Sequence, residues 1–473
     1  MSQRLLHRVL TAAVAVTMGA GLIVGATVSS AAQPRPAAPR KPTHATTWGH
    51  NSAGGLGLGS TARALTPLPV QLPPNTTSVA LGQGYSLAVA GGKVLAWGDN
   101  ELGQLGDDTT RSRLRPVRVA LPPSARVVAV AVDLDHSLAL TSTGRVYAWG
   151  HNQYGQLGDG STTNRNRPVR VPNRSRVIAI AAGQDHSLAV TRKGAVWAWG
   201  RNDVGQLGDG TTARRARPTQ TLLPHGVRAA AVSAGTSHSV AVTRNGRVIS
   251  WGPARLVGSA KTVSRPRPAP PRYVGLPDRR KVVAAAAGSR HTLALTRSGR
   301  VYAWGDNETG QLGIGSAHTR LTPQRIAVPG RPKVVSVDAT SETSLLLTSS
   351  DDVWAWEAND FGQLGNGELN HRDRPQRVEA LSGAQVKTIA AGHSHNPAIV
   401  TAPPHASRFP KPVKASPSPS SSPPPTTAES ANPKPNAVRP KGVAPEAADP
   451  GTFTSAPSPD ATGSNVRTSI GER

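Results

Sequence analysis

Short apolar runs separated by glycine-containing turns recur along most of this chain. One copy contains candidate strands at residues 127–132, 137–141, 145–149 and 167–171. Short runs of this kind joined by tight glycine turns are typical of antiparallel hairpins. Asn245-Gly246 is the strongest hairpin turn in the chain, and Gly155-Gln156-Leu157-Gly158 precedes the fourth run of the copy above. The pattern therefore predicts four short strands in each copy.

The copies repeat about every 50 residues. A Trp-Gly step marks each of them, at Trp48, Trp97, Trp149, Trp199, Trp251 and Trp304, with Trp356-Glu357 as a variant. A second element, Gly-x-x-His-Ser followed by alternating apolar residues, surrounds His186 and His238. It recurs around His136, with Asp133 for Gly, and around His291, with Thr for Ser, and has degenerate copies around Tyr85, Thr343 and His395. Seven copies of four strands predict an all-β, seven-bladed β-propeller with four-stranded blades.

The two ends of the repeat region are incomplete and complementary. The region begins with a Trp-Gly strand at 46–49 and ends with a His-type strand within 389–401. Neither end supplies a complete blade, but together they supply one. We therefore expect both terminal segments to close the ring in a shared last blade, because closure removes open sheet edges.

Four segments fit the motif Trp-Gly-x-Asn-x-x-Gly-Gln-Leu-Gly, at 97–106, 149–158, 199–208 and 304–313. Together with the segment 183–191, this motif resembles the regulator of chromosome condensation repeat, and the resemblance covers residues 46–401. It implies a seven-bladed propeller. It also implies candidate activities, because the founding member is a nucleotide-exchange factor for a nuclear small GTPase and binds chromatin. Other members are scaffolds or ubiquitin-ligase modules.

The ends of the chain differ in composition from the repeats. Arg4 and Arg8 precede an uncharged stretch at 9–28, and small residues follow at 30–32, which is the layout of a cleaved export signal. An uncleaved membrane anchor is the alternative for the same stretch. We expect a signal peptide at 1–32, a linker at 33–45, the propeller at 46–401 and a disordered tail rich in Pro, Ser, Thr and Ala at 402–473. This organisation predicts a secreted or cell-surface protein with no membrane span after cleavage.

Composition narrows the chemistry further. The 473 residues include no cysteine, which excludes disulfides, thiolate metal sites and a cysteine nucleophile in this chain. The formal net charge of +27 favours anionic partners. The loops carry few aromatic residues, so stacking on single-stranded nucleic acid is not favoured, whereas phosphate contacts to a duplex stay open.

The repeated histidines and tryptophans are predicted to serve the fold. A group that recurs at equivalent positions of a ring is expected to have the same structural role at each, and for the histidines we expect hydrogen bonds in tight turns. No Asp or Ser stands near one histidine in a way that singles out a catalytic triad. His393 and His395 lie two residues apart, but two ligands are weak evidence for a metal site. We therefore predict no catalytic residue, no metal and no cofactor.

Arginines follow the glycine-rich turns and precede a proline. The candidate basic face consists of Arg113, Arg115, Arg165, Arg167, Arg214, Arg215, Arg217, Arg265, Arg267, Arg320, Arg372 and Arg374. Two of them belong to the segment 253–273, where the Gly-Gln-Leu-Gly turn is lost and a stiff basic surface loop is expected. If the blades superpose, these arginines form a positive ring on one side. The alternative is that each arginine pairs locally with an acid of the preceding turn, such as Asp107, Asp159 or Asp209.

These features predict an exported, non-catalytic binding scaffold, as a monomer, for a protein or an anionic cell-envelope polymer. Two alternatives stay open. One is an inhibitor of a secreted enzyme such as a β-lactamase, for which Tyr154, Trp197 and Phe361 are the exposed aromatic candidates. The other is a guanine-nucleotide exchange factor for a small GTPase. Export argues against exchange, because a secreted propeller meets no such GTPase unless it is delivered into a host cell.

Overall fold

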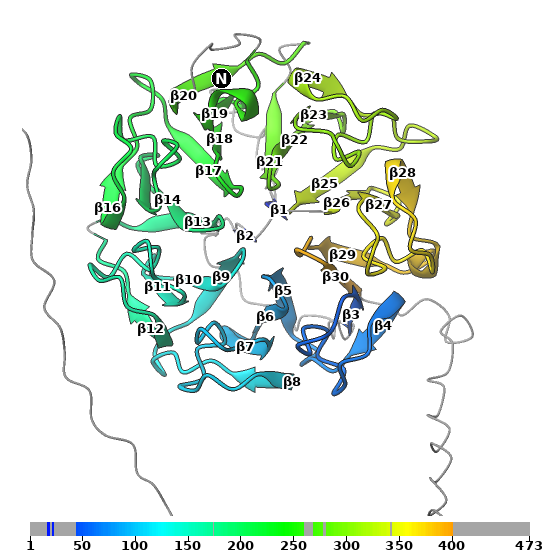
Figure 1. Ribbon diagram of the computed structural model, residues 1–473, viewed down its shortest axis with the longest axis horizontal. Coiled ribbons are helices and arrows are strands. Elements are labelled where there is room, and N and C mark those ends of the chain that lie inside the picture. The colour runs from blue at the N-terminus through cyan, green and yellow to red at the C-terminus, as the bar shows by residue number, and fades with distance from the viewer. Residues whose placement is uncertain are drawn as a thin grey trace, which may run out of the picture. The chain divides into compact units, whose positions relative to one another are not determined.

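The computed structural model describes residues 17–18, 21–22, 44–173, 175–259, 268–277, 281–340 and 343–400. Between residues 44 and 400 the chain forms seven four-stranded antiparallel sheets arranged around a central axis (Figure 1). The predicted all-β, seven-bladed propeller is confirmed.

Each blade is a meander whose strands follow one another outward from the axis (Figure 1). The first blade consists of β5 (Thr76–Leu81), β6 (Tyr85–Ala90), β7 (Lys93–Gly98) and β8 (Arg113–Arg118). The second consists of β9 (Val127–Val132), β10 (His136–Thr141), β11 (Val146–Gly150) and β12 (Arg165–Arg170). The third consists of β13 (Val177–Ala182), β14 (His186–Thr191), β15 (Val196–Gly200) and β16 (Arg215–Gln220).

Three further blades repeat this order. The fourth consists of β17 (Ala229–Ala234), β18 (Ser239–Thr243), β19 (Val248–Pro253) and β20 (Pro268–Val274). The fifth consists of β21 (Val282–Ala287), β22 (His291–Thr296), β23 (Val301–Gly305) and β24 (Arg320–Arg325). The sixth consists of β25 (Val334–Ala339), β26 (Thr343–Thr348), β27 (Val353–Glu357) and β28 (Arg372–Arg377), and the short 3-10 helix η2 (Glu379–Leu381) follows it.

Burial explains why the repeat consists of apolar runs rather than strict alternation. The middle strands are covered on both sides by neighbouring blades, and every residue of β10 is buried. A strand covered on both faces has no polar side to alternate with. The outermost strands are less covered, and no residue of β12 is fully buried. All seven repeat tryptophans are 3 % exposed or less, because each indole packs between two blades.

The seventh, closing blade combines the two ends of the repeat region. It consists of β29 (Val386–Ile389), β30 (His395–Val400), β3 (His44–Gly49) and β4 (Ala64–Val70). β3 pairs antiparallel with β30, from His44 opposite Val400 to Gly49 opposite His395. The predicted closure by both terminal segments is confirmed. The ring begins two residues earlier than expected, because residues 44 and 45 extend this pairing.

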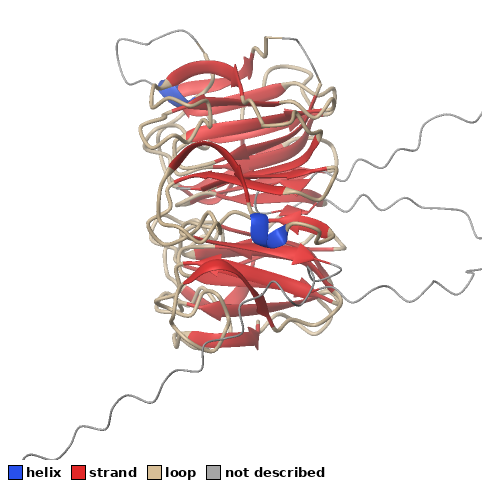
Figure 2. Cartoon of the chain, turned by 90° about the vertical axis from the view of Figure 1, so that its right-hand side faces the viewer, coloured by secondary structure: helices blue, strands red, loops and turns tan. Residues whose placement is uncertain are grey.

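The meander gives the ring two different faces, seen edge-on in Figure 2. On one face, long connections join the third strand of a blade to its outermost strand, as residues 99–112 join β7 to β8. We call this side the long-loop face. On the other, tight hairpins join the second and third strands, and short connections lead to the next blade. We call this side the hairpin face, and it also contains the paired ends of the ring-forming region, His44 and Val400.

The fourth blade departs from the repeat less than the sequence indicates. After β19 the chain forms the 3-10 helix η1 (Ala254–Leu256), and Gly258 then adopts a φ of 68° against the ring of Trp304. The main-chain oxygen of Leu256 accepts a hydrogen bond from Trp304 Nε1 at 3.2 Å. The interpretation of 253–273 as one loop is wrong for 268–273, which belong to β20. Residues 260–267 lie outside the described part of the chain.

Most of the predicted terminal segments fall outside the described residues. Of the predicted signal peptide, 1–32, only the strand pair β1 (Thr17–Met18) and β2 (Gly21–Leu22) is described, and residues 33–43 and 402–473 lie outside. None of the helices in the described ranges combines the length and the apolar character needed to cross a bilayer. The export signal, the linker and the disordered tail stay predictions.

Deleting residues 44–49 from the full chain is expected to destabilise the whole ring. The deletion removes β3 with the fully buried Trp48, leaves β4 without a partner strand and opens the edge of β30 that β3 had covered. We expect the thermal unfolding midpoint, followed by circular dichroism, to fall by about 10 °C or more. Deletion of 402–473 removes no described strand and serves as the control. An equal fall in both truncations would contradict the closing role of β3.

Candidate functional site

One repeated hydrogen-bond arrangement holds the interfaces between blades. Between the second and third blades, the main-chain oxygen of Gln156 accepts bonds from Trp199 Nε1 at 2.7 Å and from Ser187 Oγ at 2.8 Å. The Nε2 atom of His136 lies 2.9 Å from the same hydroxyl. The second blade thus supplies a histidine and a carbonyl, and the third supplies a serine and a tryptophan.

The same arrangement recurs around the ring with few substitutions. The other indole-to-carbonyl bonds join Trp48 to Gln363, Trp97 to Gly55, Trp149 to Gln104, Trp251 to Gln206, Trp304 to Leu256 and Trp356 to Gln311. The other histidine-to-hydroxyl contacts join His186 to Ser239, His238 to Thr292, His291 to Ser344 and His395 to Ser86. In the first blade Tyr85 takes the place of the histidine, and its hydroxyl lies 3.1 Å from Ser137 Oγ.

The histidines are neutral hydrogen-bond donors. Ser187 has one hydroxyl proton and donates it to Gln156, so His136 must donate from Nε2. Burial lowers the pKa of His136, His186, His291 and His395 to about 3, and that of His238 to about 4. The expectation that these histidines form hydrogen bonds in tight turns is wrong, because their bonds join neighbouring blades.

His393 and His395, the two histidines considered as metal ligands, do not form part of a metal site. His395 contacts Ser86 Oγ through Nε2 at 3.1 Å. Across the described ranges, no group of three or more His, Asp or Glu side chains is arranged to hold a metal ion.

An asparagine gives each of six long loops a fixed base. In the second blade, Asn152 Oδ1 accepts from Leu157 N at 2.9 Å, and its Nδ2 donates to Thr163 O at 2.9 Å. The same two bonds are made by Asn51, Asn100, Asn202, Asn307 and Asn359. Because each asparagine ties the glycine-rich turn to the far end of its loop, the residues between them are presented on a rigid support.

The predicted arginines that the structure describes lie within the first three residues of the outermost strands or directly before them, beside the long-loop face. We call the described members the arginine rim: Arg113, Arg115, Arg165, Arg167, Arg214, Arg215, Arg217, Arg320, Arg372 and Arg374. The remaining two, Arg265 and Arg267, lie outside the described residues.

Four arginines of the rim pair with acids of their own loop. These pairs are Arg113 with Asp107 at 2.7 Å, Arg165 with Asp159 at 2.9 Å, Arg215 with Asp209 at 2.8 Å and Arg372 with Glu368 at 2.5 Å. For Asp107, partial burial opposes ionisation, but bonds from Thr109 and Arg113 hold its pKa below the ordinary value. The local-pairing alternative therefore describes these four positions.

A second set of arginines reaches back to the preceding blade. The guanidinium groups of Arg115, Arg217 and Arg374 lie against Gly59, Gly160 and Gly315, each a turn glycine with positive φ. Among the described residues, none of these three arginines has a carboxylate partner, so no ion pair balances their positive charge. Arg167 occupies the same position opposite Asp108 and pairs with it at 3.3 Å. That pair is 62 % and 52 % exposed and contributes little to stability.

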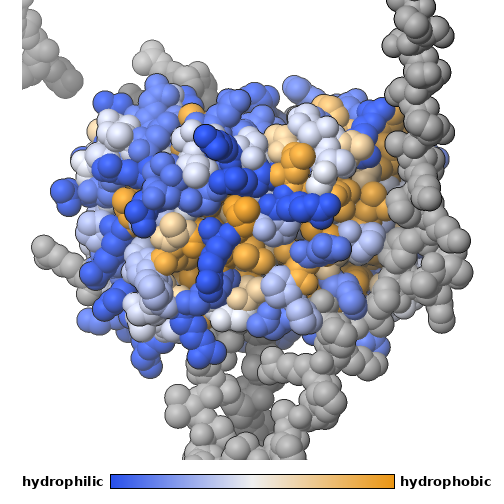
Figure 3. Space-filling model, turned by 90° about the horizontal axis from the view of Figure 1, so that it is seen from below, coloured by the Kyte–Doolittle hydropathy of each residue, from blue (hydrophilic) through white to orange (hydrophobic). Residues whose placement is uncertain are grey.

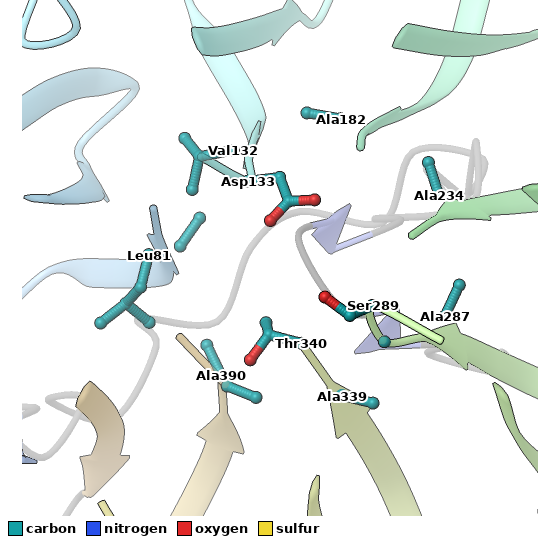
Figure 4. Close-up of a pocket in the computed structure, with 13 residues that line it drawn as sticks. Leu81, Val132, Asp133, Ala182, Ala234, Ala287, Ser289, Ala339, Thr340 and Ala390 are labelled. Atoms are coloured by element: carbon teal, nitrogen blue, oxygen red, sulfur yellow. The ribbon is translucent and has the colours of Figure 1, made fainter. Parts of the chain in front are cut away.

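The centre of the long-loop face contains a group of aspartates that was not among the predicted site residues. Asp185 lies 3.8 Å from His151 Nδ1 and 3.5 Å from Arg201 Nη1. Burial raises the pKa of Asp135 to about 6. Asp133 lies among alanines where the innermost strands converge (Figure 4). Comparing the copies would find this feature, because an aspartate precedes the repeat histidine in two of them.

Apolar and aromatic side chains do not gather into a docking patch. The ring of Tyr154 lies under the guanidinium of Arg201 at 5.2 Å, and the ring of Phe361 contacts His50 at 4.6 Å in another part of the ring. Trp197 lines a groove between the second and third blades. On the side of the ring seen in Figure 3, small apolar groups alternate with strongly hydrophilic residues. The aromatic basis expected for an enzyme inhibitor is therefore dispersed over the described residues.

Comparisons with known families match nearly the whole ring. The RCC1-like domain matches residues 41–256, and the regulator of chromosome condensation (RCC1) repeat matches 282–311, 298–347 and 350–399. The stretch between the first two matches corresponds to the fourth-blade segment in which the sequence motif is lost.

Individual relatives have different roles. The chain is 34% identical over 354 residues to the E3 ubiquitin-protein ligase HERC2 of Homo sapiens, covering 74% of this chain and 6% of HERC2. It is 30% identical over 276 residues to the ultraviolet-B receptor UVR8 of Arabidopsis thaliana, covering 58% of this chain and 51% of UVR8. The crystal structure of Prp20p from Saccharomyces cerevisiae has a TM-score of 0.69 at 26% identity and covers 76% of this chain and 92% of Prp20p. The chain spans only part of the length of HERC2 and UVR8.

Replacing Ser239 by Ala tests the interface arrangement. The change removes the hydroxyl that contacts His186 and donates to the carbonyl of Gln206, leaving a buried imidazole N–H unsatisfied. We expect the free energy of unfolding in urea to fall by about 1–3 kcal/mol. Ser239→Thr keeps a hydroxyl, as Thr292 does in the fifth blade, and is expected to retain most of the stability. Equal losses in both variants would show that the hydroxyl is not the stabilising group.

The buried histidines predict sensitivity to acid. The pKa of His186 falls from 6.5 to about 3 on folding, so the unfolded chain binds more protons between these values and stability decreases as pH falls below about 6.5. At pH 5 one such group costs about 2 kcal/mol. Burial raises the pKa of Asp338 to about 7, which acts in the opposite direction.

The variant His186→Tyr, which copies Tyr85, separates these two contributions. In parallel urea titrations at pH 7 and pH 5, the loss of stability on acidification is expected to shrink by about 2 kcal/mol relative to the unmodified chain. The same acid sensitivity in both proteins would mean that His186 does not carry the effect.

Proposed function

Because this chain belongs to the regulator of chromosome condensation repeat family, we propose that it is a non-catalytic scaffold that binds a partner protein across its long-loop face. The proposed ligand is an acidic segment of the partner. The proposed contact is the arginine rim.

The relatives support a binding platform rather than one chemistry. HERC2 is named as a ubiquitin ligase and UVR8 as an ultraviolet-B receptor, and Prp20p is described with its binding properties to Gsp1p and histones. Proteins with such different roles share this propeller, and function is carried by sites placed on a fold rather than by the fold. The partner of this chain is therefore defined by the chemistry of its own surface.

The charge balance of the rim is the observation that carries this proposal. The first three blades contribute seven rim arginines, Arg113, Arg115, Arg165, Arg167, Arg214, Arg215 and Arg217. Four aspartates pair with them, Asp107, Asp108, Asp159 and Asp209. Arg115 and Arg217 keep an uncompensated guanidinium held against a glycine turn. A planar guanidinium in a fixed orientation suits two-point binding of a carboxylate.

We also propose that the protein is exported and acts outside the cell or at its surface, on the strength of the signal-like composition of residues 1–32. Under this proposal, nucleotide exchange on an intracellular GTPase has no place. Inhibition of a secreted enzyme would be one form of the proposed protein binding. The absence of a catalytic role is supported by the use of the repeat histidines in blade interfaces.

Reversing three arginines of the rim tests the proposal. The full chain with Arg115→Glu, Arg167→Glu and Arg217→Glu is expected to bind a fluorescent glutamate-rich peptide at least about tenfold more weakly at low salt, measured by anisotropy. Raising the salt concentration should weaken the unmodified chain in the same direction, because screening shortens the reach of these charges to about 10 Å at 0.1 M.

The control carries the same change in net charge on the other face. The triple variant Arg192→Glu, Arg244→Glu and Arg297→Glu is expected to keep the peptide affinity, and thermal melts of both variants check the fold. Undiminished peptide binding by the rim variant would overturn the proposed contact. Equal weakening by both variants would reduce the effect to net charge.

A further inference from the structure

The hairpin face carries a second set of charges, which the proposed function does not use. In the first five blades, the described parts of its hairpins, its connections and the strand ends beside them contain seventeen basic residues. We call them the hairpin-face cations: Lys93, Arg118, Arg126, Arg145, Arg170, Arg176, Arg192, Lys193, Arg228, Arg244, Arg247, Lys281, Arg297, Arg300, Arg325, Arg331 and Lys333. The described residues at these positions include no Asp or Glu.

The acids that the structure describes in the same five blades lie on the opposite side. The loops of the long-loop face contain Asp99, Glu101, Asp107, Asp108, Asp133, Asp135, Asp159, Asp185, Asp203, Asp209, Asp306 and Glu308. Successive connections of a meander alternate between the two faces, so the fold separates charges that are close neighbours in the sequence. The hairpin face is consequently positive on its own account, beyond the average implied by the net charge.

Contacts on this face order the cations without neutralising them. Arg176 donates to Ser142 O at 2.9 Å. Arg244 of the fourth blade donates to Arg192 O of the third blade at 2.5 Å. Within the described ranges, the hairpin-face cations other than Arg300 form no ion pair with a carboxylate. Where the structure describes this side, its acids belong to the sixth blade, in which Asp352 and Glu379 pair with Arg377.

Two recesses concentrate these cations between blades. One, of about 400 Å³, lies between the hairpin and the connection of the fifth blade, and its lining includes Arg300, Arg325, Arg331 and Lys333. The other, of about 280 Å³, occupies the equivalent place in the first blade and is lined by Lys93 and Arg118 among apolar residues. Each has room for a phosphate group, since a water molecule occupies about 30 Å³.

We propose that the hairpin face binds a flexible, linear polymer of phosphate groups. The cations extend over five consecutive blades, so one small anion contacts only a few of them, whereas a polymer engages the whole row. Thirteen of the seventeen are arginines, whose planar fork of donors matches phosphate oxygens in pairs. Release of counterions from the polymer adds an entropic gain with every contact.

The shape of the row favours a flexible chain over nucleic acid. The cations follow the curve of the ring, and a duplex with a persistence length of about 150 base pairs touches a curved row over a short stretch only. Single-stranded nucleic acid binds through bases stacked on aromatic rings. The ring of Tyr273, on this side of the fourth blade, is already covered by the guanidinium of Arg247 at 3.3 Å.

The test uses three arginines at equivalent hairpin tips, Arg192, Arg244 and Arg297, all exposed. Long-chain inorganic polyphosphate is titrated into the full chain and into the variant Arg192→Glu, Arg244→Glu and Arg297→Glu, at about 50 to 200 mM salt. The variant is expected to bind more weakly at every salt concentration. Its slope of log affinity against log salt is expected to be smaller by about 2, because three phosphate contacts are lost.

The arginine-rim variant, Arg115→Glu, Arg167→Glu and Arg217→Glu, is the matched control, because it changes the net charge equally on the long-loop face. It is expected to retain polyphosphate affinity. Equal weakening by both triple variants, or none by the hairpin-tip variant, would overturn the proposal. A duplex DNA of the same total charge is titrated in parallel, and binding of DNA as tight as that of polyphosphate would overturn the assignment to a flexible chain.

The two proposals fail separately in these experiments. The glutamate-rich peptide reports on the arginine rim, and polyphosphate reports on the hairpin face. Loss of peptide binding with polyphosphate binding retained in the rim variant, and the reverse in the hairpin-tip variant, supports both surfaces. Thermal melts of both variants establish that the ring is folded in each measurement.

Discussion

A single main-chain oxygen in each glycine-rich turn joins two neighbouring blades. At the interface of the first and second blades, Gln104 O accepts from Trp149 Nε1 at 2.8 Å and from Ser137 Oγ at 3.0 Å. The oxygen reaches this position because the turn ends at Gly106, whose φ of 65° and contact with the indole exclude a side chain. The turn, the buried tryptophan and the hydroxyl are therefore constraints on one another, and the ring depends on all of them.

This dependence on the main chain explains which residues of the repeat are replaceable. The bond needs a carbonyl oxygen and not a glutamine side chain, so Leu256 serves in the fourth blade and Gly55 in the closing blade. The hydroxyl that contacts the repeat histidine can likewise come from threonine instead of serine, as Thr292 shows. The framework thus tolerates sequence changes that keep the backbone path. The loops between its fixed points are free to carry binding residues without cost to the interface.

Features that depend on chain spacing were predictable from the sequence, and features that depend on contacts between blades were not. The period of the Trp-Gly steps predicts the number of blades and the shared closing blade, because both follow from counting strands. The partner of His136 lies 51 residues away in the next blade, and no local pattern reveals it. Arg113 and Arg115 look alike in the sequence. The first faces an acid of its own loop and the second faces a glycine of the preceding blade.

The separation of charge between the faces is a consequence of topology that no average over the chain reports. A net charge of +27 is a total for the chain, whereas the meander places the hairpin-face cations apart from the described acids of the first five blades, which lie on the same side as the arginine rim. Strands of six residues, such as β10, place the two faces about 20 Å apart at about 3.4 Å per residue. The Debye length at 0.1 M salt is about 10 Å, so charges on one face are largely screened from ligands on the other. The acid-rich centre of the long-loop face therefore leaves the hairpin face positive, and the two faces are electrostatically independent surfaces on one rigid ring.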